Sequence, residues 1–119
     1  MQRLLNSFKY AFRGLFSAIK SEKNLQIHVI ISILVIIAGF LFKISVIEWL
    51  AVLLCIALVI GVELINTAIE KLSDFVCNEK NSEIGRIKDI SAAAVVFCAI
   101  VSAVVGIIIF LPKVFLAHG

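Results

Sequence analysis

The stretch that decides the fold runs from Val46 to Asp74 and reads VIEWLAVLLCIALVIGVELINTAIEKLSD. Its first part is apolar almost throughout, with Glu48 near one end and Glu63 near the other. A helix that crosses a bilayer needs roughly 20 mostly apolar residues, and this part supplies them. In lipid every backbone polar group must be satisfied within the segment, so the run must be helical. The stretch therefore predicts a membrane-spanning helix over residues 46–75 whose last turns leave the bilayer.

Two further apolar runs flank this stretch. One ends at Phe42 and predicts a span over residues 24–42, and the other runs without a charge from Ile90 to Leu111 and predicts a span over residues 88–111. The chain of 119 residues is 62% hydrophobic and 16% charged, whereas a water-soluble domain is about half apolar and a quarter charged. The composition excludes a soluble or disordered domain. It predicts a single all-α integral-membrane domain over residues 1–119.

Residues 1–22 form a separate element ahead of the spans. Apolar side chains recur at helical spacing on one side of it: Leu5, Phe8, Phe12, Leu15, Phe16 and Ile19. Basic and polar side chains fall on the other side: Arg3, Asn6, Lys9, Tyr10, Arg13, Ser17 and Lys20. This pattern predicts an amphipathic helix that lies in the membrane interface. Such a helix either only anchors the chain or also lines a site for an anionic ligand with its basic face.

The basic residues are divided unequally between the two sides of the predicted membrane. Most of them precede the first span or lie between the second and third: Arg3, Lys9, Arg13, Lys20, Lys23, Lys71, Lys80, Arg86 and Lys88. The other side has only Lys43 and Lys113. Because cytoplasmic segments carry the excess of Lys and Arg, we expect the N-terminus in the cytoplasm. Trp49, near the opposite end of the second span, fits an interfacial anchor on the outer side.

Four polar residues form a stripe where the second span leaves the membrane. Glu63, Asn66, Glu70 and Asp74 follow one another at intervals of three or four residues, so they share one helix face over roughly 16 Å. An acidic side chain at mid-membrane costs about 2.5–3.5 kcal/mol, and such residues usually face protein or water and have a function. A helix end that exposes its acids to solvent would explain Asp74 better than Glu63 and Asn66.

The stripe suits phosphoryl transfer to a membrane alcohol. Glu63 lies where a lipid hydroxyl would arrive and could accept its proton, while Glu70 could hold Mg²⁺, which binds one or two carboxylates together with phosphate oxygens. Lys88 is expected near the start of the third spanning helix, where backbone N–H groups also favour anions, although a flanking positive charge explains it as well. Glu22, before the first span, could give a second carboxylate to the metal, or could be a solvated loop acid. The soluble nucleotide motifs GxxxxGK[ST] and GxGxxG are absent from the sequence.

The sequence resembles the small prokaryotic integral-membrane diacylglycerol kinases over nearly its whole length. The central signature is Glu63-x-x-Asn66-Thr-Ala-Ile-Glu70-x-x-x-Asp74, followed by Gly85-Arg86-x-Lys88-Asp89. The N-terminal pattern Phe8-Lys-Tyr-Ala-Phe-Arg-Gly-Leu15 and the segment Glu22-x-Asn24-x-x-x-His28 match as well. The resemblance implies an ATP- and Mg²⁺-dependent lipid kinase in the cell membrane of a prokaryote, assembled as a homotrimer that shares sites between neighbouring subunits, with no nucleic-acid partner.

The resemblance also implies roles for individual residues. Glu63 would be the general base, Asn66 would support it, and both would contact the lipid substrate. Glu22 and Glu70 would coordinate magnesium. The nucleotide would be bound by Arg3, Tyr10, Glu22, Glu70, Asp74, Lys88 and Asp89. Trp49 is a further predicted contact for the lipid substrate.

Two questions stay open at this point. The Glu-x-Asn-x-x-x-His pattern that ends at His28 resembles the branch in which several members phosphorylate undecaprenol, so the acceptor is either that alcohol or diacylglycerol. The alternative function is a small proton-coupled transporter that uses Glu63. A transporter would want its acid near mid-membrane. A purely structural membrane subunit would need no polar stripe.

Overall fold

The computed structural model describes residues 1–118, which form four helices in the order α1 (Gln2–Ser21), α2 (Lys23–Leu41), α3 (Val46–Val76) and α4 (Ser82–His118). Three stretches are long and apolar enough to cross a membrane: Lys23–Leu41, Val46–Val76 and Ser82–Leu116. The all-helical fold and the three apolar helices expected from the sequence are confirmed.

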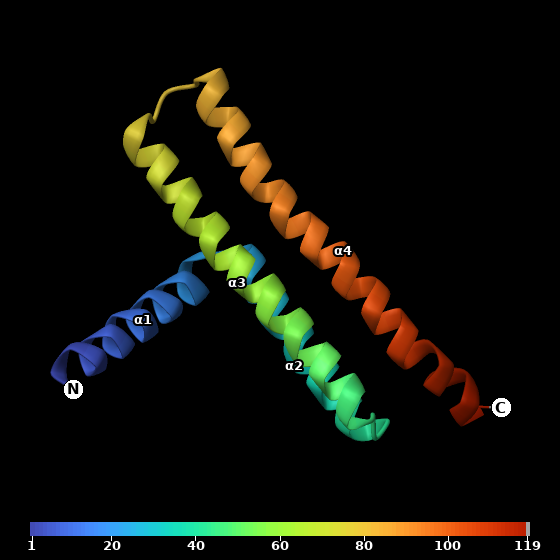
Figure 1. Ribbon diagram of the computed structural model, residues 1–119. Coiled ribbons are helices and arrows are strands. Elements are labelled where there is room, and N and C mark those ends of the chain that lie inside the picture. Colours follow the sequence, from blue (N-terminus) through green and yellow to red (C-terminus); the bar gives the residue numbers. More distant parts are fainter. Residues whose placement is uncertain (119) are drawn as a thin grey trace.

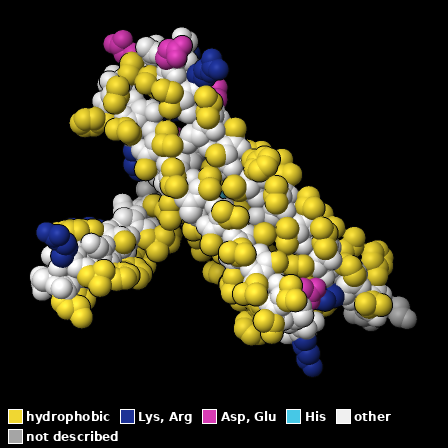
Figure 2. All heavy atoms as spheres, in the orientation of Figure 1, with side chains coloured by type: hydrophobic (Ala, Val, Ile, Leu, Met, Phe, Trp, Pro, Cys, Tyr) yellow, Lys and Arg dark blue, Asp and Glu magenta, His cyan; other side chains and the backbone are white. Residues whose placement is uncertain are grey.

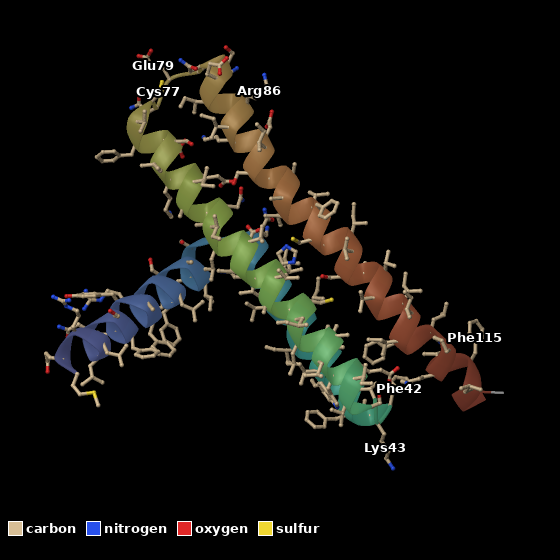
Figure 3. All side chains as sticks on the ribbon, viewed as in Figure 1. Phe42, Lys43, Cys77, Glu79, Arg86 and Phe115 are labelled. Atoms are coloured by element: carbon tan, nitrogen blue, oxygen red, sulfur yellow. The ribbon has the colours of Figure 1, made fainter. Side chains whose placement is uncertain are left out.

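Helices α2, α3 and α4 run side by side, and α1 leaves them at an angle (Figure 1). A short turn joins α2 to the antiparallel α3 at one end of the bundle, and a five-residue loop over 77–81 joins α3 to α4 at the other. Figure 3 shows Phe42 and Lys43 at the first end and Cys77, Glu79 and Arg86 at the second. The α2–α3 turn and the 77–81 loop therefore lie at opposite ends of the bundle.

Side-chain caps fix the starts of α3 and α4. Ser45 and Glu48 form a capping box at the start of α3: the Ser45 hydroxyl accepts from the Glu48 N–H at 3.2 Å, and Glu48 Oε1 accepts from the Ser45 N–H at 2.9 Å. Lys43 lies in the tight turn that precedes α3, and its φ there is 52°. At the start of α4, Asn81 Oδ1 accepts from the N–H groups of residues 83 and 84 at 2.9 and 3.2 Å.

The Asn81 cap corrects one expectation. Helix α4 begins at Ser82, six residues before the predicted span, and continues through Pro112. Lys88 is therefore in its second turn rather than at its start. The free N–H groups of a helix belong to its first turn, so they do not assist Lys88 in binding an anion as the sequence suggested.

The unequal lengths of the helices set the level of the functional residues. At 1.5 Å per residue, α2 is about 28 Å long, close to the hydrocarbon thickness of a bilayer, whereas α3 is about 46 Å long. Helix α2 ends at the turn from which α3 begins, and the two helices run antiparallel. The start of α2, at its corner with α1, therefore lies about level with Glu63 on α3. The last turns of α3 and the first turns of α4 extend beyond that corner (Figure 1).

The surface and interior of the bundle are distributed as in a membrane protein. Figure 2 shows hydrophobic side chains over most of the visible face, with acidic and basic side chains gathered at the ends. Inside, the apolar cluster of Ile44, Val52 and Ile109 packs near the α2–α3 turn. The buried polar residues lie further along, in the second half of α3 and the first half of α4: Glu63, Asn66, Thr67, Ser73 and Ser91. One end of the bundle is thus packed by apolar groups and the other contains a buried polar site.

Trp49 packs closely on the backbone of α2. A Cβ added at Gly39 would lie 2.6 Å from Trp49 Cη2 and 3.1 Å from Ile44 Cδ1, so only glycine fits without a shift of the indole ring. We expect Gly39→Ala to destabilise the protein by about 1–3 kcal/mol through overpacking, measured as a lower thermal unfolding midpoint in detergent. Gly61→Ala is the matched control because a Cβ there meets nothing within 4 Å. An equal midpoint for both variants would show that this contact does not constrain the fold.

Candidate functional site

Glu63 is the most deeply buried acid of the described chain. Its residue is 3% exposed, and the side chain points from α3 toward α2. Its Oε2 lies 4.0 Å from His28 Nε2, which is the nearest basic group. Glu63 faces protein rather than lipid, as a functional acid in a membrane helix should.

A hydrogen-bonded chain links α4 to the next acid on α3. The Ser91 hydroxyl donates to Asn66 Oδ1 at 2.6 Å, and Asn66 Nδ2 donates to Glu70 Oε1 at 3.1 Å. Asn66 is buried and Glu70 is partly exposed. The polar stripe predicted from the spacing therefore starts inside the bundle at Glu63 and becomes accessible at Glu70.

Glu22 is placed by the corner between α1 and α2. It is the one non-helical residue between these helices, with φ −106° and ψ 112°. Gln26 holds the corner, because its Nε2 donates to the carbonyl of Ile19 at 2.8 Å. The Glu22 carboxylate reaches α3, where Oε1 lies 3.5 Å from Lys71 Nζ. The corner thus brings a third acid to the level of Glu63.

The three carboxylates are close enough to interact. Glu22 and Glu70 both act electrostatically on Glu63. Lys71 pairs with Glu22, and His28 is the basic neighbour of Glu63. Negative charge therefore exceeds fixed positive charge in this cluster, which favours a bound cation.

The carboxylates fit magnesium in one specific way. Among residues 1–116, whose side chains are described, no group of three or more His, Cys, Asp or Glu side chains is arranged to hold a metal ion by itself. Mg²⁺ needs only one or two carboxylates when phosphate oxygens and waters complete its shell. Glu22 and Glu70 each supply a carboxylate of the kind that this coordination uses.

A polar pocket lies beyond the carboxylates, between the end of α3 and the start of α4. Lys88 on α4 forms an ion pair with Asp74 on α3 and is also in electrostatic range of Glu70. A pocket of about 250 Å³ opens beside this pair and is lined by the 77–81 loop, Ile84 and Gly85. Asp89 is exposed next to Lys88. The short 77–81 loop therefore places Lys88 beside Asp74 near the end of α3.

An apolar groove approaches the site from the membrane side. It is lined by residues of α2, α3 and α4 and has a volume of about 270 Å³. His28 and Val59 are among its lining residues, and Val59 lies one turn before Glu63 on α3. The groove therefore leads along the span toward the buried carboxylate.

Three predicted site residues lie away from this cluster. Arg3 and Tyr10 are exposed on α1, and Arg3 is separated from Glu22 by about 28 Å of helix. Tyr10 stacks with its own neighbour, Arg13, whose Cζ lies 5.5 Å from the ring centre. Trp49 is about 21 Å of helix from Glu63, beside Gly39. Their nucleotide and substrate contacts stay predictions.

Sequence reasoning missed the contacts of Ser91 and Lys71. It gave Ser91 no role in the site and counted Lys71 only as a cytoplasmic charge. Ser91 lies one turn after Lys88 on α4, so the 88–91 spacing on one face was an available signal. Lys71 directly follows Glu70 and gave no comparable signal.

Known proteins are similar to this chain over most of its length. The model of the prokaryotic diacylglycerol kinase family matches residues 9–110. The chain belongs to this family. An undecaprenol kinase of Bacillus subtilis is 37% identical over 113 residues, which cover 95% of this chain and 92% of that protein.

Two diacylglycerol kinases are similar as well. The protein of Haemophilus influenzae is 32% identical over 111 residues, covering 92% of this chain and 94% of its own length. That of Synechocystis is 36% identical over 110 residues, covering 92% of this chain but 63% of its own length. The enzyme class predicted from the sequence, a lipid kinase, is confirmed. With its three apolar helices, the chain is a multi-pass membrane protein.

Proposed function

We propose that the chain transfers the γ-phosphate of ATP to the hydroxyl of a membrane lipid alcohol at the cytoplasmic face. The observation that carries the proposal is the placement of Glu63. This buried carboxylate lies one turn beyond Val59, which lines the apolar groove, and is followed on the same helix by polar groups that become increasingly exposed. A lipid acceptor and a water-soluble donor can meet only at such a boundary.

Glu63 is the general base in this proposal. Its carboxylate accepts the proton of the acceptor hydroxyl as the oxygen attacks the γ-phosphorus, and the bond from that phosphorus to ADP breaks, so that ADP leaves. Asn66 lies one turn later and supports the site through its bond to Glu70. Lys88 neutralises charge on the phosphate groups, for which it would exchange its pairing with Asp74.

Glu22 and Glu70 would hold the magnesium ion that accompanies ATP. When bound, the ion neutralises phosphate charge and orients the phosphates. The two residues approach from different elements, the α1–α2 corner and α3, so the corner held by Gln26 would control their separation.

The nucleotide would extend from these acids toward the pocket at the α3–α4 connection. Asp74, Lys88 and Asp89 line or adjoin that pocket. Arg3 and Tyr10 lie along α1, away from it, so within a homotrimer they would serve the site of a neighbouring copy. The resemblance to enzymes with shared sites supports this arrangement.

The membrane would lie across the bundle with α1 on its cytoplasmic surface. Helix α1 meets the bundle at the level of Glu22, and Figure 2 shows hydrophobic side chains along one side of it. The larger number of basic residues on α1 and at the α3–α4 connection supports a cytoplasmic N-terminus.

The hydrocarbon part of the acceptor would occupy the apolar groove between α2, α3 and α4. The names of the relatives supply two acceptors, undecaprenol and diacylglycerol. The assay that tests the function uses purified protein in mixed micelles with labelled ATP, Mg²⁺ and each alcohol in turn. We expect label in the lipid phase, and the larger kcat/KM identifies the acceptor. Absence of transfer to either alcohol, with proton-coupled flux in vesicles instead, would favour a transporter.

A further inference from the structure

The hydrogen bond between Ser91 and Asn66 joins two helices inside the bundle. Ser91 is 8% exposed and Asn66 is 5% exposed, and the hydroxyl and the amide oxygen are 2.6 Å apart. The residues are 25 positions apart in the sequence. The ion pairs that also join α3 and α4 in the described chain, Lys88 with Asp74 and Lys113 with Glu48, involve side chains that are at least a quarter exposed. The bond from Ser91 is therefore the one that water competes for least.

The Ser91 hydroxyl and the Glu70 carboxylate together determine which end of the Asn66 amide faces the acids. An asparagine side chain has one oxygen that accepts and one nitrogen that donates. The Ser91 hydroxyl donates to the oxygen, so the nitrogen is directed to Glu70 Oε1 at 3.1 Å. An ionised carboxylate can only accept, so the reverse orientation would place two acceptors together.

We propose that Ser91 is a positioning residue, which fixes the Asn66 amide and through it the carboxylate of Glu70. This inference rests on the proposed function, in which Glu70 holds the metal that accompanies ATP. Without the hydroxyl, Asn66 Oδ1 would be a buried acceptor that lacks its partner. The three residues that follow Ser91 are alanines and offer no substitute donor. The amide would then be free to rotate toward the cation, and Glu70 would lose its donor.

The first test compares Ser91→Ala with Ser91→Thr in the lipid kinase assay. For Ser91→Ala we expect kcat to fall about fivefold and the Mg²⁺ concentration for half-maximal activity to rise about threefold, the size of one lost hydrogen bond. The KM for the lipid should not change. Ser91→Thr keeps the hydroxyl and should restore both values. Ser82→Ala, at an exposed serine in the first turn of α4, is the matched control and should behave like the unaltered chain.

The second test is a double-mutant cycle with Asn66→Ala. If Ser91 acts only through Asn66, adding Ser91→Ala to Asn66→Ala should change the measured values by less than about twofold. The affinity for Mg²⁺ with a non-hydrolysable ATP analogue is measured by calorimetry alongside kcat, so the cycle can be read even in a variant without turnover. Thermal unfolding in detergent reports whether each variant is folded.

The outcomes separate the two proposals. An active unaltered chain with unchanged kcat and Mg²⁺ dependence in Ser91→Ala would overturn the positioning role. The role would also be overturned if Ser91→Ala lowered kcat and Mg²⁺ affinity equally in the unaltered chain and in Asn66→Ala. The effect would then not pass through the amide of Asn66. A lack of lipid phosphorylation by the unaltered chain would instead reject the proposed function.

Discussion

Replacing Glu63 by glutamine should lower kcat for lipid phosphorylation by about a hundredfold or more, the usual contribution of a general base. Glutamine keeps the shape of the side chain but cannot take the proton of the acceptor hydroxyl. The position is 3% exposed, so bulk water has little access to replace the lost base. The measurement is kcat in mixed micelles at saturating ATP and lipid. Size-exclusion chromatography and thermal unfolding should show an assembled and folded variant.

The matched control for this experiment is Glu48→Gln. Glu48 lies on the same helix at the opposite end of the bundle, where it pairs with Lys113 at 3.1 Å. Glutamine can still complete the capping box with Ser45, and a partly exposed ion pair contributes at most about 1 kcal/mol. Its activity should therefore stay near that of the unaltered chain. If Glu63→Gln retains activity within about tenfold of the unaltered chain, the assignment of Glu63 as base is wrong.

The spacing along α3 was enough to predict which residues would share a face. Glu63, Asn66 and Glu70 follow one another at the helical repeat, and the structure joins Asn66 to Glu70 by a hydrogen bond. The increase in exposure from Glu63 to Asp74 also follows from sequence, because the apolar run ends there. Periodicity within one helix is a local property, so one sequence can reveal it.

Contacts between helices could not be predicted in the same way. The bond between Ser91 and Asn66 depends on how α4 is rotated and shifted against α3, and periodicity determines neither quantity. The packing of Trp49 on Gly39 depends in the same way on the α2–α3 turn. The sequence predicted that Trp49 is an interfacial anchor but did not indicate its neighbour.

The position of Lys88 within α4 was misjudged for a local reason. The apolar run suggested that the helix starts with the span, whereas the Asn81 side chain caps it at Ser82. A membrane span is defined by its contact with lipid, and a helix is defined by its backbone bonds, so a helix can extend beyond its span when a cap supports it. The added turns carry Lys88 along the protruding part of α3 and opposite Asp74.

Replacing Glu70 by glutamine should raise the Mg²⁺ concentration needed for half-maximal activity by about tenfold or more. Loss of a residue that only supports a metal ligand already weakens binding by about 10–100-fold, and Glu70 is proposed as a ligand itself. Glutamine also changes the bond with Asn66, because its amide group can present either an oxygen or a nitrogen to Asn66 Nδ2. The measurement is a Mg²⁺ titration of activity at fixed free ATP.

Glu83→Gln is the matched control, since Glu83 is an exposed acid in the first turn of α4 and lies outside the carboxylate cluster. It removes the same charge from the end of the bundle where α3 and α4 are joined, and it should leave the Mg²⁺ titration unchanged. If loss of negative charge alone weakened Mg²⁺ binding, the Mg²⁺ concentration for half-maximal activity would rise in both variants. If a metal ligand is lost, it rises only in Glu70→Gln. An unchanged metal dependence in Glu70→Gln would remove Glu70 from the metal site. Glu22 would then be the remaining carboxylate proposed for the ion, and the path from Ser91 through Asn66 would no longer end at the metal.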